Sequence, residues 1–177
     1  MPVKLSYEEI SDKRHNLEES HNISRIPIVV ILENIRSLYN VGSIFRTSDA
    51  AAVEKIYLTG FTGKPPRKEI DKTALGAVES VPWEYREDHL TLIDELKQAG
   101  YKIAALEHCH ESKDIFHFKW DGKIAIILGN EVFGVTDEMA AKADVALEIP
   151  MFGVKQSLNV SVAYGISVYA LINGYNK

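Results

Sequence analysis

Short apolar runs recur along the chain from residue 27 onward and alternate with longer stretches of mixed polarity. The run Ile28–Leu32 contains no polar residue, which is typical of a strand buried on both faces of a sheet. Further strands are predicted at 55–60, 83–85, 102–107, 123–128 and 145–149, and helices at 40–52, 68–76, 88–99, 136–142 and 157–173. This alternation predicts an α/β fold with a mainly parallel sheet and helices on both of its faces.

The two ends of the chain have different patterns. The first 26 residues are polar, and we expect a surface helix over 6–20 as an extension of one domain that spans 1–177. The last predicted helix carries apolar side chains around most of its circumference, so something besides its own sheet must bury it. A second subunit is one candidate. The pair Asn173-Gly174 is a C-cap signal and predicts the end of this helix.

Composition limits the class of protein. The 177 residues suit one domain, and contents of 46% apolar and 25% charged residues exclude an intrinsically disordered chain. The longest apolar runs have five residues, whereas a membrane span needs roughly 20. The charged N-terminus lacks a secretory segment, and the single Cys109 cannot form an internal disulfide. We therefore expect a soluble, cytoplasmic protein. The net charge of −5, taken alone, argues against a nucleic-acid partner.

Candidate chemistry lies where the predicted strands end, because ligands of open parallel sheets bind outside the carboxyl ends of the strands. Three of the segments there, ENIRSLYNVG, GNEVFG and PMFGVKQSLN, combine glycine with Asn, Glu or Ser, which indicates a ligand site. The motifs GxGxxG, GxxxxGK[ST], HExxH and GxSxG are absent, as is paired CxxC. His108, Cys109 and His110 would alternate between the faces of a strand, so no metal site is predicted.

Each polar segment also has a purely structural interpretation when it is taken alone. Asn40 and Ser157 are good N-cap residues for the helices that follow them, and Glu131 resembles an ordinary loop carboxylate. Gly42 and Arg46 lie four residues apart on one helix face, so Arg46 can lie over the space beside Gly42, aimed at the crevice. The alternative is a capped surface helix with a solvated arginine.

Taken together, three segments resemble the three signature motifs of the SpoU/TrmH family of RNA ribose 2′-O-methyltransferases, within the SPOUT superfamily. The first is Asn40-x-Gly42-x-x-x-Arg46-Thr47, and the second is ILGNEVFG, which contains Gly129, Glu131 and Gly134. The third is IPMFGVKQSLNVSVA, residues 149–163. The segments occur in the family's order, no motif position departs from the pattern, and the resemblance covers residues 28–172.

The resemblance implies S-adenosylmethionine as methyl donor, a ribose 2′-hydroxyl of RNA as acceptor, a C-terminal trefoil knot, and a homodimer whose site lies near the subunit interface. It assigns the cofactor to five residues, of which the first is the less certain: Leu106, Gly129, Ile149, Met151 and Leu158. It assigns catalysis and RNA contact to another five: Asn40, Arg46, Glu131, Ser157 and Asn159.

The role of Arg46 stays open at this point. A guanidinium is a poor base because its pKa exceeds about 12. Either a substrate phosphate helps it to accept the hydroxyl proton, or it only positions and polarises the hydroxyl. Asn40 and Glu131 would then orient Arg46, while Ser157 and Asn159 would fix the loop and the target ribose.

The RNA itself is less defined. Only about 26 residues precede the first strand, so we expect the domain or its dimer to bind RNA without a further module, which favours tRNA over ribosomal RNA. A local basic face would bind RNA despite the net charge of −5. The alternative is that these charges only solvate a surface loop. The candidate residues of the basic face are Arg36, Lys64, Arg67, Lys68 and Lys155. Two other functions compete: a non-catalytic RNA-binding relative, and a nucleotide-cofactor oxidoreductase, which the missing glycine-rich fingerprint disfavours.

Overall fold

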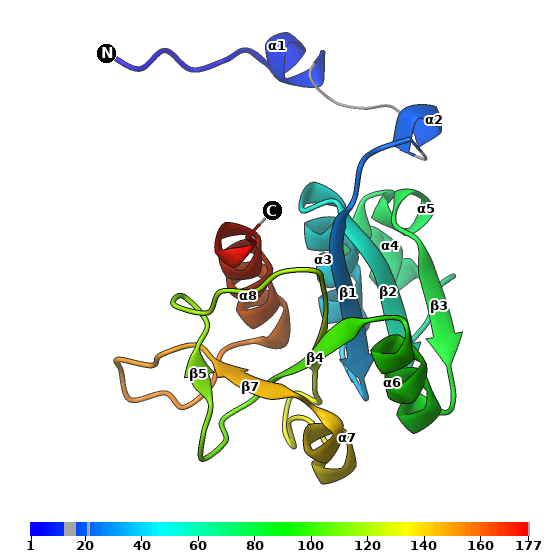
Figure 1. Ribbon diagram of the computed structural model, residues 1–177. Helices are drawn as coiled ribbons and strands as arrows, with labels where there is room; N and C mark the ends of the chain where they lie inside the picture. The colour runs from blue at the N-terminus through cyan, green and yellow to red at the C-terminus, as the bar shows by residue number, and fades with distance from the viewer. Residues whose placement is uncertain (13–16, 21, 177) are drawn as a thin grey trace.

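The structure is a computed structural model that describes residues 1–12, 17–20 and 22–176. Its centre is a seven-stranded sheet in which every pairing is parallel, in the order β3-β2-β1-β6-β4-β7-β5 (Figure 1). The strands are β1 (Ile26–Glu33), β2 (Val53–Thr59), β3 (Trp83–Arg86), β4 (Tyr101–Leu106), β5 (Lys113–Asp114), β6 (Lys123–Leu128) and β7 (Val145–Glu148). The six predicted strands are present. The two-residue edge strand β5 was not predicted, because its Lys-Asp sequence has no apolar run.

Helices cover both faces of the sheet, which confirms the predicted α/β fold (Figure 1). On β1, Ile28, Val30 and Leu32 pack with α3, α4, α5 and α8, while Val29 and Ile31 face α6 and α7. This alternation explains why the run had to be wholly apolar. The helices are α1 (Tyr7–Ser11), α2 (Leu17–Ser20), α3 (Leu38–Ala50), α4 (Lys68–Ala74), α5 (Ala77–Ser80), α6 (His89–Gln98), α7 (Asp137–Lys142) and α8 (Val160–Gly174).

Three predicted helices have different bounds. The helix predicted over 6–20 is wrong in its described part, since α1 ends at Ser11 and α2 begins at Leu17; residues 13–16 lie outside the described residues. The helix predicted over 68–76 divides because Leu75 and Gly76 have φ of 48° and 90° and separate α4 from α5. The last helix begins at Val160 rather than 157. It ends at Gly174, as the pair Asn173-Gly174 predicted, with Tyr175 as the C-cap residue. Trp120 hydrogen-bonds carbonyl groups in the final turns of this helix. Its indole N–H donates to Leu171 O (2.7 Å), and its backbone N–H donates to Gly174 O (3.2 Å).

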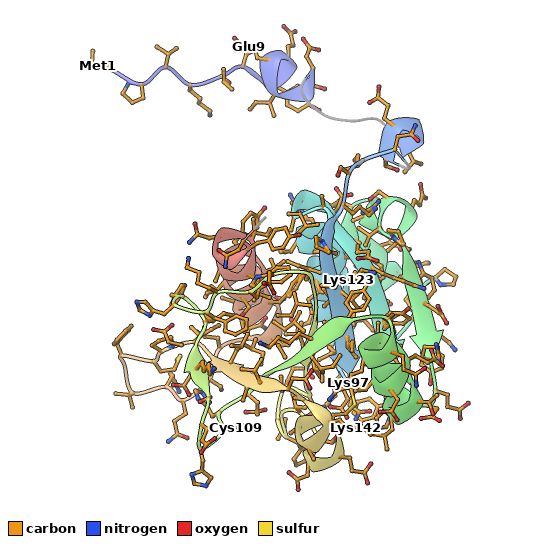
Figure 2. All side chains as sticks on the ribbon, in the orientation of Figure 1. Met1, Glu9, Lys97, Cys109, Lys123 and Lys142 are labelled. Atoms are coloured by element: carbon orange, nitrogen blue, oxygen red, sulfur yellow. The ribbon has the colours of Figure 1, made fainter. Side chains whose placement is uncertain are left out.

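The N-terminal segment has few contacts with the sheet. No residue of α1 is buried, and Met1 and Glu9 lie away from the strands (Figure 2). Arg25 ties the end of this segment to the body by donating to the carbonyl groups of Val53 (3.1 Å) and Ser80 (2.6 Å). That the chain forms a single domain, and that its C-terminal part is knotted, stay predictions.

The carboxyl ends of β1, β4, β6 and β7 meet at one edge of the sheet. There the fully buried carboxylate of Glu33, the last residue of β1, accepts hydrogen bonds from the backbone N–H (3.0 Å) and hydroxyl (2.6 Å) of Thr136. Thr136 is the N-cap of α7, so this contact fixes α7 to the central strand. None of the described helices has the length and apolar content to cross a lipid bilayer.

Candidate functional site

A cavity of about 270 Å³ lies at this edge, between the loops that follow β4, β6 and β7 and the first turn of α8. Its size is close to the lower limit of small-molecule sites, about 300 Å³. The second and third motif segments line it together, although they are far apart in the sequence, whereas no residue of the first motif is in its lining. Its lining includes the five residues assigned to the cofactor, Leu106, Gly129, Ile149, Met151 and Leu158, together with Glu131 and Ser157.

The cavity has an apolar floor and a negative rim. Glu107, Glu131 and Glu148 line it, whereas no lysine or arginine of the described chain does. The hydroxyl of Ser112 donates to Glu148 (2.5 Å), and this bond, followed by the contact with His108, holds the pKa of Glu148 below its ordinary value. These carboxylates therefore favour a ligand that carries positive charge.

Glu131 joins the loop after β6 to the loop after β1. One carboxylate oxygen accepts from Arg36 N–H (2.9 Å), and the other accepts from Ser37 N–H (3.0 Å) and the Asn40 amide (2.9 Å). Burial alone would raise the pKa of Glu131, but these three hydrogen bonds outweigh it and the pKa is lowered. Glu131 is thus an anion that holds the backbone at the start of α3.

Asn40 connects all three motif segments. Besides donating to Glu131, its side chain accepts from the amide of Asn159 (3.1 Å). The predicted caps were wrong in both helices. Ser37 caps α3 and leaves the Asn40 side chain free for these bonds, and Asn159, rather than Ser157, caps α8 by accepting from Ser161 N–H (2.9 Å).

Arg46 lies apart from this network. It is exposed, and it makes no hydrogen bond or ion pair within the described part of the chain. Six residues of helix separate it from Asn40, a rotation of about 240° and a rise of about 9 Å. The expectation that Arg46 fills the space beside Gly42 was wrong, because α4 occupies that space: a Cβ on Gly42 would overlap the carbonyl oxygen of Ile70 and the hydroxyl of Thr73.

The residues predicted to contact RNA follow β1, β2 and β7 and are therefore near the same edge of the sheet. Arg36 is held by its backbone beside Glu131, and Lys64 lies over the ring of Tyr85 (4.0 Å). Arg67 and Lys68 begin α4, and Lys155 lies in the exposed loop before α8. Apart from the contact of Lys64 with this ring, these side chains have no hydrogen-bonding or charged partner among the described residues.

Sequence reasoning missed two residues of the cavity, Glu107 and His108. Glu107 accepts from the N–H groups of His108 (2.8 Å) and Val135 (3.0 Å), and the His108 ring bridges Glu148 (3.4 Å) and Gln156 O (3.2 Å). Their position directly after β4 was the available signal, but the segment was considered only for metal binding. No group of three or more His, Cys, Asp or Glu in the described chain is placed to hold a metal, and Cys109 is exposed at a loop (Figure 2).

The chain matches known proteins over most of its length. The model of the SpoU rRNA Methylase family matches residues 27–169, which include all three motif segments. A tRNA (guanosine(18)-2′-O)-methyltransferase of Thermus thermophilus is 32% identical over 160 residues, covering 89% of this chain and 80% of that protein. A Staphylococcus aureus protein whose name places it in the TrmH family of tRNA/rRNA methyltransferases is 30% identical over 161 residues, or 91% of this chain, and the chain spans 64% of its length.

Solved structures share the fold. The TrmH/SpoU tRNA modifying enzyme of A. aeolicus superimposes with a TM-score of 0.79 at 30% identity, covering 87% of this chain and 79% of that one. The AdoMet-bound rRNA methyltransferase from Sinorhizobium meliloti superimposes with a TM-score of 0.77 at 29% identity, covering 85% and 58%.

Proposed function

The chain belongs to the SpoU rRNA Methylase family, and from that premise we propose that it transfers a methyl group from S-adenosylmethionine to RNA. The observation that carries the proposal is the cavity at the carboxyl edge of the sheet. The second and third motif segments line this cavity, and the Glu131–Asn40–Asn159 hydrogen bonds connect both of them to the first motif.

The residues of the cavity fit S-adenosylmethionine. The apolar side chains of Leu106, Ile149 and Leu158 suit an adenine ring, and the carboxylates at the rim suit positive groups. When bound, this cofactor supplies a methyl group made electrophilic by a positively charged sulfur. The pyrophosphate of NAD would meet the same carboxylates without any lysine or arginine to balance it, which argues against the oxidoreductase alternative. We propose that Leu106, Gly129, Ile149, Met151 and Leu158 hold the cofactor.

We propose the ribose 2′-hydroxyl as the acceptor. Support comes from the three motifs and from the name of the Thermus thermophilus relative, which specifies 2′-O-methylation. The hydroxyl must be oriented and must lose its proton, and Arg46 has a free guanidinium for a substrate phosphate or hydroxyl. Asn40, Glu131 and Asn159 fix the surrounding loops, and Ser157 lies at the cavity, where it can contact the ribose.

We propose tRNA as the substrate, with ribosomal RNA as the alternative. The relatives' names include tRNA-specific enzymes and one rRNA enzyme. Binding would use a basic face of exposed side chains around an acidic cavity, which reconciles an RNA partner with the net charge of −5. Its residues are Arg36, Lys64, Arg67, Lys68 and Lys155.

We propose that the chain works as a homodimer through α8. Val162 and Tyr169 are each half exposed on this helix, although they are apolar or aromatic, and α8 packs on α3 through the Ser48–Tyr164 hydrogen bond (2.7 Å). A second copy on this face would therefore lie near the helix that carries Arg46. Light scattering that shows a monomer at assay concentrations would contradict the dimer.

The test is methyl transfer from labelled S-adenosylmethionine to separate pools of unmodified tRNA and ribosomal RNA, with Arg46→Ala as the variant. We expect wild-type transfer to tRNA, at least a hundredfold less with Arg46→Ala, and cofactor affinity within about twofold of wild type, because Arg46 does not line the cavity. Substantial turnover by Arg46→Ala would exclude an essential role. RNA binding without transfer by the wild type would favour the non-catalytic alternative.

A further inference from the structure

Two phenylalanines are exposed in loops beside the site. Phe61 follows β2 and is 63% exposed, and Phe133 follows β6 and is 86% exposed. An aromatic ring left in water at a functional edge costs solubility and offers a large flat surface to a ligand. Neither ring belongs to the apolar core on either side of the sheet.

A pair of asparagines fixes the two loops to each other. The backbone N–H of Phe61 donates to the side-chain oxygen of Asn34 (3.2 Å), and that of Phe133 donates to the side-chain oxygen of Asn130 (3.1 Å). The asparagines are joined in turn, since the Asn130 amide donates to Asn34 O (2.8 Å). Both phenylalanines are therefore presented on one hydrogen-bonded frame.

The backbone of this frame is held in an uncommon conformation. Asn34 has φ of 57°, in the left-handed region that asparagine tolerates better than most residues. Gly60, next to Phe61, has φ of 58°, and a Cβ there would overlap the side-chain oxygen of Asn34. Thr62 adds two more bonds, donating to Leu32 O (2.9 Å) and accepting from Ile35 N–H (3.0 Å). The loop is thus ordered before any ligand binds, which lowers the entropy cost of binding.

The positively charged side chain of Arg36 lies close in sequence to this hydrogen-bonded frame. Arg36 comes two residues after Asn34, its backbone is fixed by Glu131 (2.9 Å), and its exposed guanidinium has no partner in the described chain. The nearby carboxylates of Glu131 and Glu107 already accept backbone N–H groups. Aromatic faces combined with free cations are how proteins bind unpaired RNA, by stacking on bases and contacting the backbone.

We propose that Phe61 and Phe133 are stacking platforms for unpaired nucleobases that flank the methylated nucleotide, and that Arg36 contacts the phosphates between them. This inference rests on the proposed function, because it places the RNA beside the cavity that Phe133 helps to line. It specifies the substrate as a single-stranded or looped region, since a base inside a duplex offers no free face to a ring.

The test compares Phe61→Ala and Phe133→Ala with the control Phe116→Ala, which removes a ring 51% exposed after the edge strand β5. The full chain is titrated with a labelled single-stranded oligoadenylate, with an RNA duplex and with unmodified tRNA. Each platform variant should weaken binding of the single strand and of tRNA about fivefold to a hundredfold, the effect of losing one base–aromatic stack. Binding of the duplex and binding by the control should change less than about twofold. Phe61→Tyr and Phe133→Tyr should restore affinity because they keep the aromatic face.

Four results would overturn the inference. Equal weakening of single strand and duplex would show contact with the backbone alone, and unchanged affinity for both would show no contact. Lower affinity of Phe133→Ala for S-adenosylmethionine with RNA binding intact would assign that ring to the cofactor, and loss of dimer in light scattering would assign it to a subunit interface. If the wild type methylates tRNA and the variants behave like it, only this inference fails. If the wild type neither binds nor methylates RNA, the proposed function fails with it.

Discussion

At the scale of single residues, Glu131 and Arg46 differ in what surrounds their charges. Glu131 receives three hydrogen bonds from the start of α3, while Arg46 has no charged or hydrogen-bonding partner in the described chain. The lowered pKa of Glu131 makes it an anchor rather than a proton acceptor, because a base must have a pKa near the working pH. In the proposed reaction, Glu131 is therefore not the group that takes the proton of the ribose hydroxyl.

Glu131→Gln should lower the free energy of unfolding at neutral pH but leave it unchanged in acid. An amide cannot accept with both of its polar atoms, so we expect the free energy of unfolding to fall by about 1 kcal/mol, a small value because the side chain is solvent-accessible. A lowered pKa stabilises the fold above the ordinary glutamate pKa of about 4.3, and this stabilisation is lost as pH falls through the pKa of the folded state. Thermal unfolding at pH 7 and at about pH 3 measures the difference between variant and wild type.

Glu138→Gln provides the matched control, because Glu138 is exposed in the first turn of α7 and no hydrogen bond to its carboxylate is present among the described residues. Its unfolding should follow the wild type closely at both pH values. A destabilisation by Glu131→Gln that is as large in acid as at neutral pH would contradict an ionised anchor.

At the scale of secondary-structure elements, the site depends on how α3 is packed. Its first turn carries Asn40, its middle carries Arg46, and α4 crosses it so closely at Gly42 that no side chain fits between the two helices. The pairing also brings Arg67 and Lys68, at the start of α4, next to the helix that carries the proposed catalytic arginine. The position of the basic face is therefore set by helix packing.

Gly42→Ala should destabilise the protein by about 1–3 kcal/mol, the usual cost of overpacking, although alanine is the better helix former. Gly153→Ala in the loop before α8 is the control, because a Cβ there meets no atom within 4 Å and its φ is not in the left-handed region. Denaturant unfolding of both variants compares them directly. A Gly42→Ala protein as stable as Gly153→Ala would show that α4 does not pack against α3 as closely as the structure has it.

The sequence was informative where local pattern decides the outcome. The wholly apolar run at β1 predicted a strand covered on both sides, and the strand ends correctly indicated the edge that holds the cavity. Predictions were wrong where a segment distant in the sequence determines a side chain's contacts. The space at Gly42 is taken by α4, a helix almost thirty residues later in the chain. The side chain of Asn40, predicted as a cap, instead bonds Glu131 and Asn159 in distant loops. Local spacing carries no information about such contacts.

At the scale of the whole molecule, charge is distributed unevenly. Carboxylates line the cavity, while the loops after β1, β2 and β7 carry exposed lysines and arginines without charged partners in the described chain. A net charge of −5 is the sum of both and does not describe the surface that RNA would meet. The same separation would keep a phosphate-rich substrate out of the cofactor cavity and hold it at the rim.

Reversing two of these charges, Arg67→Glu with Lys68→Glu, should weaken tRNA binding at least about tenfold. It should also make the negative slope of the logarithm of the binding constant against the logarithm of salt concentration shallower by about 2. The control is Lys119→Glu with Lys123→Glu, which changes the net charge equally. Lys123 begins β6 and so lies at the opposite end of the strands from the cavity (Figure 2). Equal effects of the two double variants, or binding insensitive to salt, would contradict a local basic face.

The central claim is that the methyl group is transferred to a ribose 2′-oxygen of RNA. The most direct measurement is alkaline hydrolysis of tRNA that the wild-type chain has labelled with radioactive S-adenosylmethionine. Alkali cleaves RNA through the 2′-hydroxyl, so a methylated 2′-oxygen protects the neighbouring phosphodiester bond. We expect label in alkali-resistant dinucleotides, and at least a hundredfold less label with Arg46→Ala. Label that appears in mononucleotides would place the methyl group on a base and contradict the central claim.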